Sequence, residues 1–221
     1  MARGRARRRC DVRVNPPANL LITGPPGIGK TTVLERVIAC LPPAAATGFV
    51  TRELRARGVR QGFVIETLDG RSALLASVRF DAGPRVGRYR VRIAALDTVA
   101  VPALAARPGV RLVVVDEIGK MESLSPRFAA AVRAALDSPV PVLGTIARSG
   151  GALIAEVRRR PDVTLVGSPA CSGFDAPWRT ALHVGVAFLS PRDPRAPQRG
   201  TRPPRAARAI RLSDAHRLGT P

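Results

Sequence analysis

The clearest candidate for chemistry is a glycine-rich segment, residues 24–31, which reads Gly-Pro-Pro-Gly-Ile-Gly-Lys-Thr. It fits the pattern G-x-x-x-x-G-K-[ST] (Walker A), with an apolar run before it and apolar residues of helical period after it. Glycines let such a loop curl until its N–H groups point at phosphate oxygens, and the following helix adds its positive dipole end. The segment predicts a phosphate-binding loop contributed by Gly24, Pro25, Pro26, Gly27, Ile28, Gly29, Lys30, Thr31 and Thr32.

Two side chains of this loop have separate expected roles. Lys30 would reach the β- and γ-phosphate oxygens as a point charge, and the Thr31 hydroxyl would bind Mg²⁺. The alternative is a Gly/Pro turn that happens to precede Lys-Thr. The strand-like run before the loop and the helical pattern after it argue against that alternative.

A pair of carboxylates is the second candidate. Asp116 and Glu117 follow the apolar run Leu-Val-Val-Val (Walker B), as expected for a buried strand that ends at a ligand site. Asp116 would complete the Mg²⁺ shell through water, and Glu117 would polarise an attacking water molecule. Alone, the same residues would fit a strand that leaves the core into a polar turn, so the interpretation depends on the phosphate loop.

Phosphoryl transfer often uses an arginine against developing charge. Arg148 and then Arg52 are the first candidates, followed by Arg55 and Arg60, because each falls near a strand end or in a loop. The chain holds 34 Arg among its 36 basic residues, so most arginines are expected on the surface; its two lysines are Lys30 and Lys120.

Further residues have structural explanations. Glu122 is expected to be a structural partner or cap, and Cys40 to pack in the core.

The elements that must position these groups follow from the hydrophobic pattern. Residues 19–23 predict a strand, and residues 31–41 a helix that ends at a Pro-Pro pair. Residues 47–93 contain several β-rich runs separated by turn signals, among them Asp69-Gly70, and predict an inserted antiparallel meander.

The remainder of the chain alternates between helical and strand patterns, which favours a mostly parallel sheet. Helices are predicted at residues 94–106, 126–136 and 151–160, and strands at residues 110–115, 140–146 and 163–166, with a possible last strand at 180–189. Ser125 and the following proline are suited to begin the helix over 126–136.

Composition limits the class of protein. The 221 residues are 45% hydrophobic, enough for a core, and carry a net charge of +20. Residues 1–14 contribute +5 and residues 191–221 contribute +6, so about half of the excess lies in a basic arm and a Pro/Arg-rich tail that are expected to be disordered. Three widely spaced cysteines predict no disulfide framework or zinc site, and the chain shows no membrane span or secretory signal. A cytoplasmic protein is expected.

Several segments together carry a resemblance to a known family. The segment Asp116-Glu-Ile-Gly-Lys-Met-Glu122 resembles a signature of the nucleoside-triphosphatases first described from thermophiles, whose human member is the cancer-related nucleoside triphosphatase. The phosphate loop agrees, and so do Gly48-Phe-Val-Thr-Arg-Glu53, Gly58-Val-Arg-Gln-Gly-Phe63, Leu68-Asp-Gly70, Val86-Gly-Arg-Tyr89 and Pro141-Val-Leu-Gly-Thr-Ile146. The resemblance covers about residues 19–166.

The resemblance implies an α/β fold: a P-loop NTPase (RecA-like) sheet flanked by helices, with the meander inserted. It implies a cytosolic enzyme that hydrolyses ATP, GTP, CTP and UTP to diphosphates with Mg²⁺, in which Lys30, Thr31, Asp116 and Glu117 take the phosphate, metal and water roles. Members usually carry an Asn-Arg pair after the last strand, where this chain reads Pro169-Ala-Cys-Ser-Gly173.

The predicted organisation is an arm (1–14), a nucleotide-binding domain (15–175, with the insertion at 47–93) and a tail (176–221). Two other functions stay open. One is a P-loop kinase that passes the γ-phosphate to a nucleoside or small metabolite. The other is a nucleotide-dependent nucleic-acid-binding protein that uses its basic arms, although aromatics make up only 4% of the chain. A monomer is expected.

Overall fold

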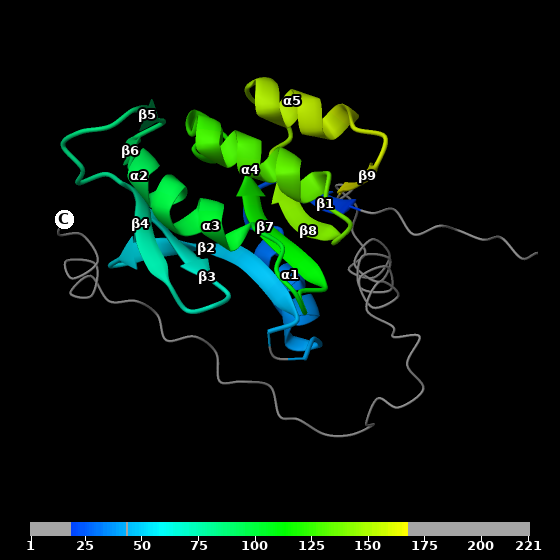
Figure 1. The fold of residues 1–221 in the computed structure, drawn as a ribbon. Helices are drawn as coiled ribbons and strands as arrows, with labels where there is room; N and C mark the ends of the chain where they lie inside the picture. Colours follow the sequence, from blue (N-terminus) through cyan, green and yellow to red (C-terminus); the bar gives the residue numbers. More distant parts are fainter. Residues whose placement is uncertain (1–18, 43, 168–221) are drawn as a thin grey trace, which may run out of the picture.

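The computed structural model describes residues 19–42 and 44–167. The predicted basic arm, the tail and the possible strand at 180–189 lie outside the described residues. Within them, one nine-stranded sheet has the strand order β5-β6-β4-β3-β2-β7-β8-β1-β9 (Figure 1). The strands are β1 (Asn19–Thr23), β2 (Ala46–Ala56), β3 (Val59–Thr67), β4 (Ser72–Ser77), β5 (Arg85–Val86), β6 (Tyr89–Val91), β7 (Leu112–Ile118), β8 (Val142–Ile146) and β9 (Val163–Gly167).

The sheet has a parallel half and an antiparallel half that share β2. Strands β2, β7, β8, β1 and β9 pair in parallel, whereas β2, β3, β4, β6 and β5 pair antiparallel. The α/β prediction with an inserted meander is therefore confirmed, and the meander proves to continue the main sheet. At Gly48 the backbones of β2 and β7 approach so closely that a Cβ atom would lie 1.9 Å from the Val114 carbonyl oxygen. The shared strand thus requires glycine at this point.

Helices cover both faces of the sheet (Figure 1). Helix α1 (Lys30–Ala39) packs through Val33, Leu34 and Val37 on one face. The other face carries α4 (Pro126–Leu136), α5 (Ala152–Arg159) and a helical stretch built from α2 (Ile93–Ala95), the π-helical η1 (Leu96–Ala100) and α3 (Val101–Ala103). The short 3₁₀ helix η2 (Glu122–Leu124) precedes α4. Among the described residues, no helix has the length and apolar character to span a membrane.

Several predicted elements match the structure closely. Helix α4 has the predicted bounds, and the Ser125 hydroxyl accepts a hydrogen bond from the Phe128 backbone N–H as an N-cap.

Two other elements differ from their predicted bounds. The helix predicted over residues 94–106 is shorter and has a π-helical centre, in which the Val101 N–H donates to the Leu96 carbonyl. The strand predicted to stop at residue 115 continues to Ile118, so both acidic residues belong to it.

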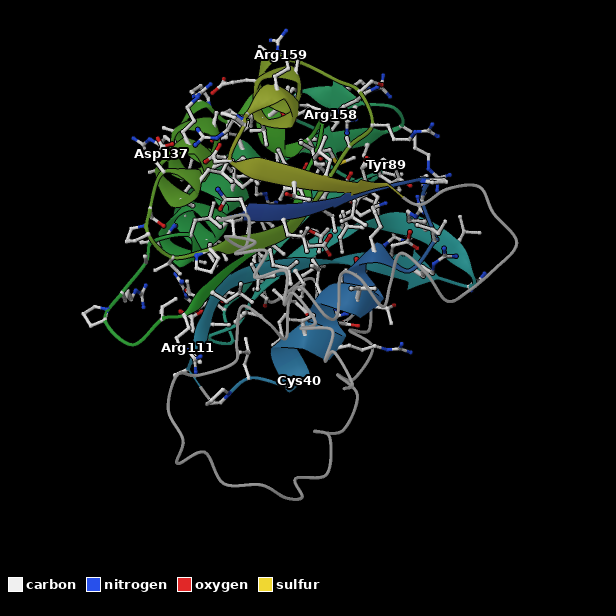
Figure 2. All side chains as sticks on the ribbon, turned by 90° about the vertical axis from the view of Figure 1, so that its right-hand side faces the viewer. Cys40, Tyr89, Arg111, Asp137, Arg158 and Arg159 are labelled. Carbon is white, nitrogen blue, oxygen red and sulfur yellow. The ribbon has the colours of Figure 1, made fainter. Side chains whose placement is uncertain are left out.

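The prediction that Cys40 packs in the core is wrong. The thiol follows the last turn of α1 and is exposed (Figure 2).

Candidate active site

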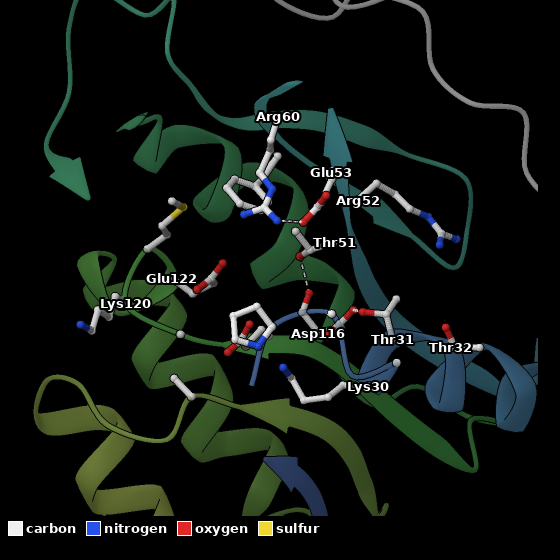
Figure 3. Close-up of a pocket in the computed structure, with 18 of the residues that line it drawn as sticks. Lys30, Thr31, Thr32, Thr51, Arg52, Glu53, Arg60, Asp116, Lys120 and Glu122 are labelled. Carbon is white, nitrogen blue, oxygen red and sulfur yellow. Dashed lines mark hydrogen bonds and ion pairs between the residues drawn. The ribbon is translucent and has the colours of Figure 1, made fainter. Parts of the chain in front are cut away.

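A pocket of about 630 Å³ lies between the phosphate loop and the hairpin formed by β2 and β3 (Figure 3). Its lining comes from segments far apart in the sequence: Pro26, Gly27, Gly29, Lys30, Thr31, Thr32, Glu35, Thr51, Arg52, Glu53, Arg60, Phe63, Val86, Asp116, Glu117, Gly119, Lys120, Met121, Glu122 and Ala147. We call the residues from the loop, α1 and β7 the phosphate wall, namely Gly27, Gly29, Lys30, Thr31, Thr32, Asp116 and Glu117. The hairpin wall comprises Thr51, Arg52, Glu53, Arg60 and Phe63.

The phosphate loop has the backbone geometry that its glycines predict. Gly27 and Gly29 have φ angles of 79° and 90°, in the left-handed region that other residues rarely adopt. The Lys30 ammonium donates to the carbonyl oxygens of Gly24 and Pro25, at 3.2 and 3.3 Å. The start of α1 and the Lys30 side chain thus meet at one end of the pocket. Of the predicted loop residues, Gly24, Pro25 and Ile28 do not line it.

Asp116 is buried and accepts hydrogen bonds from three threonine hydroxyls. Its side chain is 3% exposed, and its two carboxylate oxygens accept hydrogen bonds from the Thr31 hydroxyl at 2.7 Å and the Thr145 hydroxyl at 2.6 Å. The Thr51 hydroxyl donates to its backbone carbonyl (Figure 3). Burial raises the pKa of Asp116, and the hydroxyl donors and the Lys30 charge oppose that rise. The Asp116 carboxylate therefore links β7 to α1 and β8, and its backbone carbonyl links β7 to β2.

Glu117 reaches the pocket because β7 changes its register against β8 between Val115 and Ile118. Strict alternation after Val113 and Val115 would turn residue 117 towards the core, but Ile118 packs there in its place. The Glu117 side chain is half-buried and lines the pocket, and the Asp116–Glu117 peptide bond is cis. Burial raises the pKa of Glu117, opposed by the nearby Lys30 charge.

The donor set suits a hard divalent cation. The Thr31 hydroxyl and the Asp116 carboxylate lie in direct contact and offer only oxygen ligands, which Mg²⁺ prefers. No group of three or more His, Cys, Asp or Glu side chains that could hold a metal occurs in residues 19–42 and 44–167. An ion here would take its other ligands from phosphate and water, as Mg²⁺ usually does.

Glu122 is a third carboxylate of the pocket. It is 6% exposed, and burial, with the charges of Glu117 and Asp116, raises its pKa to about 8. The Glu122 carboxylate packs closely against Gly119, where a Cβ atom would lie 2.7 Å from the Glu122 Oε2 atom and would displace it. The prediction of a structural role stays untested; the side chain nevertheless lines the pocket.

The four candidate arginines separate in the structure. Arg148 and Arg55 are exposed and do not line the pocket, whereas Arg52 and Arg60 do. Arg52 is paired with Glu35 of α1 and, at 3.1 Å, with Glu66 of β3. Lys120 lines the pocket but is exposed.

Two threonines were not predicted. Thr51 and Thr145 contact Asp116 across sequence separations of 65 and 29 residues. Thr145 lies near the carboxyl end of the predicted strand beside β7, which is the one signal that could have indicated it.

Comparisons with known proteins agree with this geometry. The family described as NTPase matches residues 19–167. The nucleoside-triphosphatase THEP1 of Thermofilum pendens is 44% identical over 153 residues, covering 66% of this chain and 84% of that protein. The human cancer-related nucleoside-triphosphatase is 39% identical over 161 residues, covering 66% and 85%.

A solved structure shares the fold. The crystal structure of THEP1 from the hyperthermophile Aquifex aeolicus superposes with a TM-score of 0.61 at 34% identity, covering 67% of this chain and 88% of that one. The matched residues include the phosphate loop, the acidic pair and the hairpin. The chain therefore belongs to the NTPase family of nucleoside-triphosphatases.

Proposed function

We propose that the protein catalyses Mg²⁺-dependent hydrolysis of nucleoside 5′-triphosphates to diphosphates and phosphate, with broad base tolerance. The observation that carries the proposal is the meeting of Lys30, Thr31, Asp116 and Glu117 at one pocket that begins at a phosphate loop. The names of the relatives agree with it, because they are nucleoside-triphosphatases.

The phosphate wall would bind the triphosphate. Backbone N–H groups of the loop and the N-terminal end of α1 attract phosphate oxygens, and the Lys30 ammonium would exchange its carbonyl acceptors for β- and γ-oxygens. All of these contacts are to phosphate oxygens and none is to the base, which supports broad base tolerance.

Thr31 and Asp116 would hold Mg²⁺, which when bound neutralises charge on the β- and γ-phosphates. Thr145 positions Asp116 through its 2.6 Å hydrogen bond, so the carboxylate is fixed before substrate arrives. Asp116 would thus be a preorganised ligand for the metal.

Glu117 would act as the general base. Its carboxylate takes a proton from a water molecule as the water oxygen bonds to the γ-phosphorus, and the bond from that phosphorus to the β–γ bridging oxygen breaks. The electron pair leaves with the diphosphate. The raised pKa of Glu117 makes the carboxylate a stronger base than an exposed one.

Phosphate release from ATP, GTP, CTP and UTP with Mg²⁺ tests the proposal. We expect release from all four by the wild type, and about a 100-fold or greater loss in Glu117→Gln and Lys30→Ala. Glu156→Gln, on the exposed face of α5, is the matched control and should retain wild-type rates. Mg²⁺-dependent nucleotide binding without phosphate release would refute the hydrolase and favour the kinase alternative.

Location and assembly are part of the same proposal. We take the protein to be cytoplasmic and monomeric, and gel filtration at several protein concentrations checks the second point.

A further inference from the structure

Arg60 approaches the pocket from β3, on the side opposite the phosphate loop. Figure 3 shows its guanidinium at the hairpin wall, across the pocket from Lys30. The phosphate wall supplies only one side chain with a fixed positive charge, Lys30, so a cation on the opposite wall would face the outer phosphate of a bound triphosphate.

The Arg60 side chain is held in place by aromatic rings. Its guanidinium lies 5.5 Å from the centre of the Phe63 ring, and that ring packs edge-on against Tyr89 at 5.2 Å. Arg88 lies over Tyr89 and donates to the Arg60 backbone carbonyl at 2.5 Å. These contacts hold the Arg60 backbone in place and keep its guanidinium beside the pocket.

Arg60 also has an unused donor. Within residues 19–42 and 44–167, its Nε is the one fully buried side-chain nitrogen or oxygen without a hydrogen-bond partner. A buried donor without a partner destabilises the folded protein, and a hydrogen bond to a phosphate oxygen would remove that penalty. Arg52, by contrast, already uses its guanidinium on Glu35 and Glu66.

The carboxylate that holds Arg60 has a second partner. Glu53 pairs with Arg60 through Oε1 and with Arg55 through Oε2, at 2.6 Å from the Arg55 Nη2 atom. If Arg60 turned towards substrate, Arg55 would keep Glu53 paired. Release of Arg60 therefore leaves no carboxylate uncompensated.

We infer that Arg60 is a further catalytic residue, which donates hydrogen bonds to the γ-phosphoryl oxygens as the bond to the leaving diphosphate breaks. The planar guanidinium suits this role because it offers several N–H groups in a fixed fork. The inference rests on the proposed triphosphatase function. It replaces Arg148 and Arg52, which position in the sequence favoured.

The test compares Arg60→Ala and Arg60→Lys with Arg55→Ala. Arg55 is the matched control because it shares Glu53 but does not line the pocket. We expect Arg60→Ala to lower kcat about 100-fold or more, Arg60→Lys to recover part of it, and Arg55→Ala to stay within about 2-fold. Free guanidinium ion should partly rescue Arg60→Ala, which a purely structural role would not allow.

A binding measurement separates this inference from the proposed function. Aluminium fluoride with ADP and Mg²⁺ mimics the transferring phosphoryl group, so the wild type should bind ADP more tightly when it is present, and Arg60→Ala should lose that gain. Wild-type protein that neither releases phosphate nor gains affinity would overturn the proposed function. A wild type that does both, with Arg60→Ala and Arg60→Lys unchanged or Arg55→Ala equally impaired, would overturn the role of Arg60 alone.

Discussion

The two walls of the pocket are built in different ways. The phosphate wall uses left-handed glycines, the start of a helix and short polar side chains that contact one another within 3 Å, as Thr31 and Asp116 do. The hairpin wall uses long side chains, Arg52, Glu53 and Arg60, held by ion pairs and by the ring of Phe63.

The contrast indicates that the phosphate wall is the more rigid part of the site and the hairpin wall the more adaptable part. The groups of the phosphate wall are fixed by the loop backbone and by short hydrogen bonds to the Asp116 carboxylate, so small changes in this wall should remove activity. The hairpin wall depends on pairings between side chains, and each pairing can be exchanged for another. We therefore expect large effects on catalysis from the first wall and graded effects from the second, with Arg60 as the exception.

The largest effect is expected from Asp116→Asn. The amide removes the negative charge and presents an NH₂ group to either the Thr31 or the Thr145 hydroxyl, both of which now donate to the carboxylate. We expect about a 1,000-fold loss of kcat/KM, or about 4 kcal/mol, measured with a Mg²⁺ titration. A smaller loss than that of Arg60→Ala would reverse the comparison between the walls.

Gly48→Ala tests the strand that joins the two halves of the sheet. The new Cβ atom would meet the Val114 carbonyl at 1.9 Å, at a φ of 117°. We expect a loss of about 3–4 kcal/mol in the free energy of unfolding, measured with urea. Gly58→Ala is the control, since its φ is 76° but its surroundings are open; it should cost about 1 kcal/mol. Equal losses would show that the close approach is unimportant.

Glu122→Gln should change how stability depends on pH. Because the folded-state pKa is raised from 4.5 to about 8, the folded protein binds the proton more tightly than the unfolded chain. Wild-type stability therefore falls as pH rises from about 4.5 through 8, and the glutamine variant lacks this loss. Nucleotide-free protein in a chelator should show a difference on the order of 4 kcal/mol between pH 5 and pH 8.5, measured by denaturation at each pH. If the free energy of unfolding depended on pH in the same way in both proteins, a raised pKa of Glu122 would be contradicted.

Arg52→Ala should have the smallest effect. The arginine links Glu35 on α1 to Glu66 on β3, and these side chains are partly exposed, so solvent weakens the pairs. We expect a loss of about 1 kcal/mol in the free energy of unfolding and a change in kcat well below that of Arg60→Ala. A kcat loss as large as that of Arg60→Ala would move the catalytic arginine to position 52.

The phosphate wall could be predicted from sequence because its determinants are local. The spacing of Gly24, Gly29, Lys30 and Thr31 fixes a loop before a helix, and an apolar run ending in two carboxylates fixes a strand end. The same locality explains the N-cap at Ser125, where a serine and a proline suffice.

The remaining features depend on contacts that local pattern cannot show. Carboxylates favour strands little, so the strand was expected to end before Asp116; pairing beside β8 carries it on to Ile118. Arg60 is one of 34 arginines, and only the ring of Phe63, the pair with Glu53 and the unpaired Nε set it apart. Thr51 reaches Asp116 across 65 residues, a juxtaposition set by the pairing of β2 with β7.

The shared strand β2 has a consequence for how the pocket can move. Its first residues pair with β7, and its later residues, among them Thr51 and Arg52, form the hairpin wall. The pairing with β7 ends at Phe49, where the pairing with β3 begins, so the chain passes from one wall to the other within a single continuous strand. A change in the distance between the walls would therefore require β2 to bend near Phe49, whereas rotamer changes of Arg60 and Lys30 would adjust the pocket to a bound triphosphate and leave the sheet unchanged.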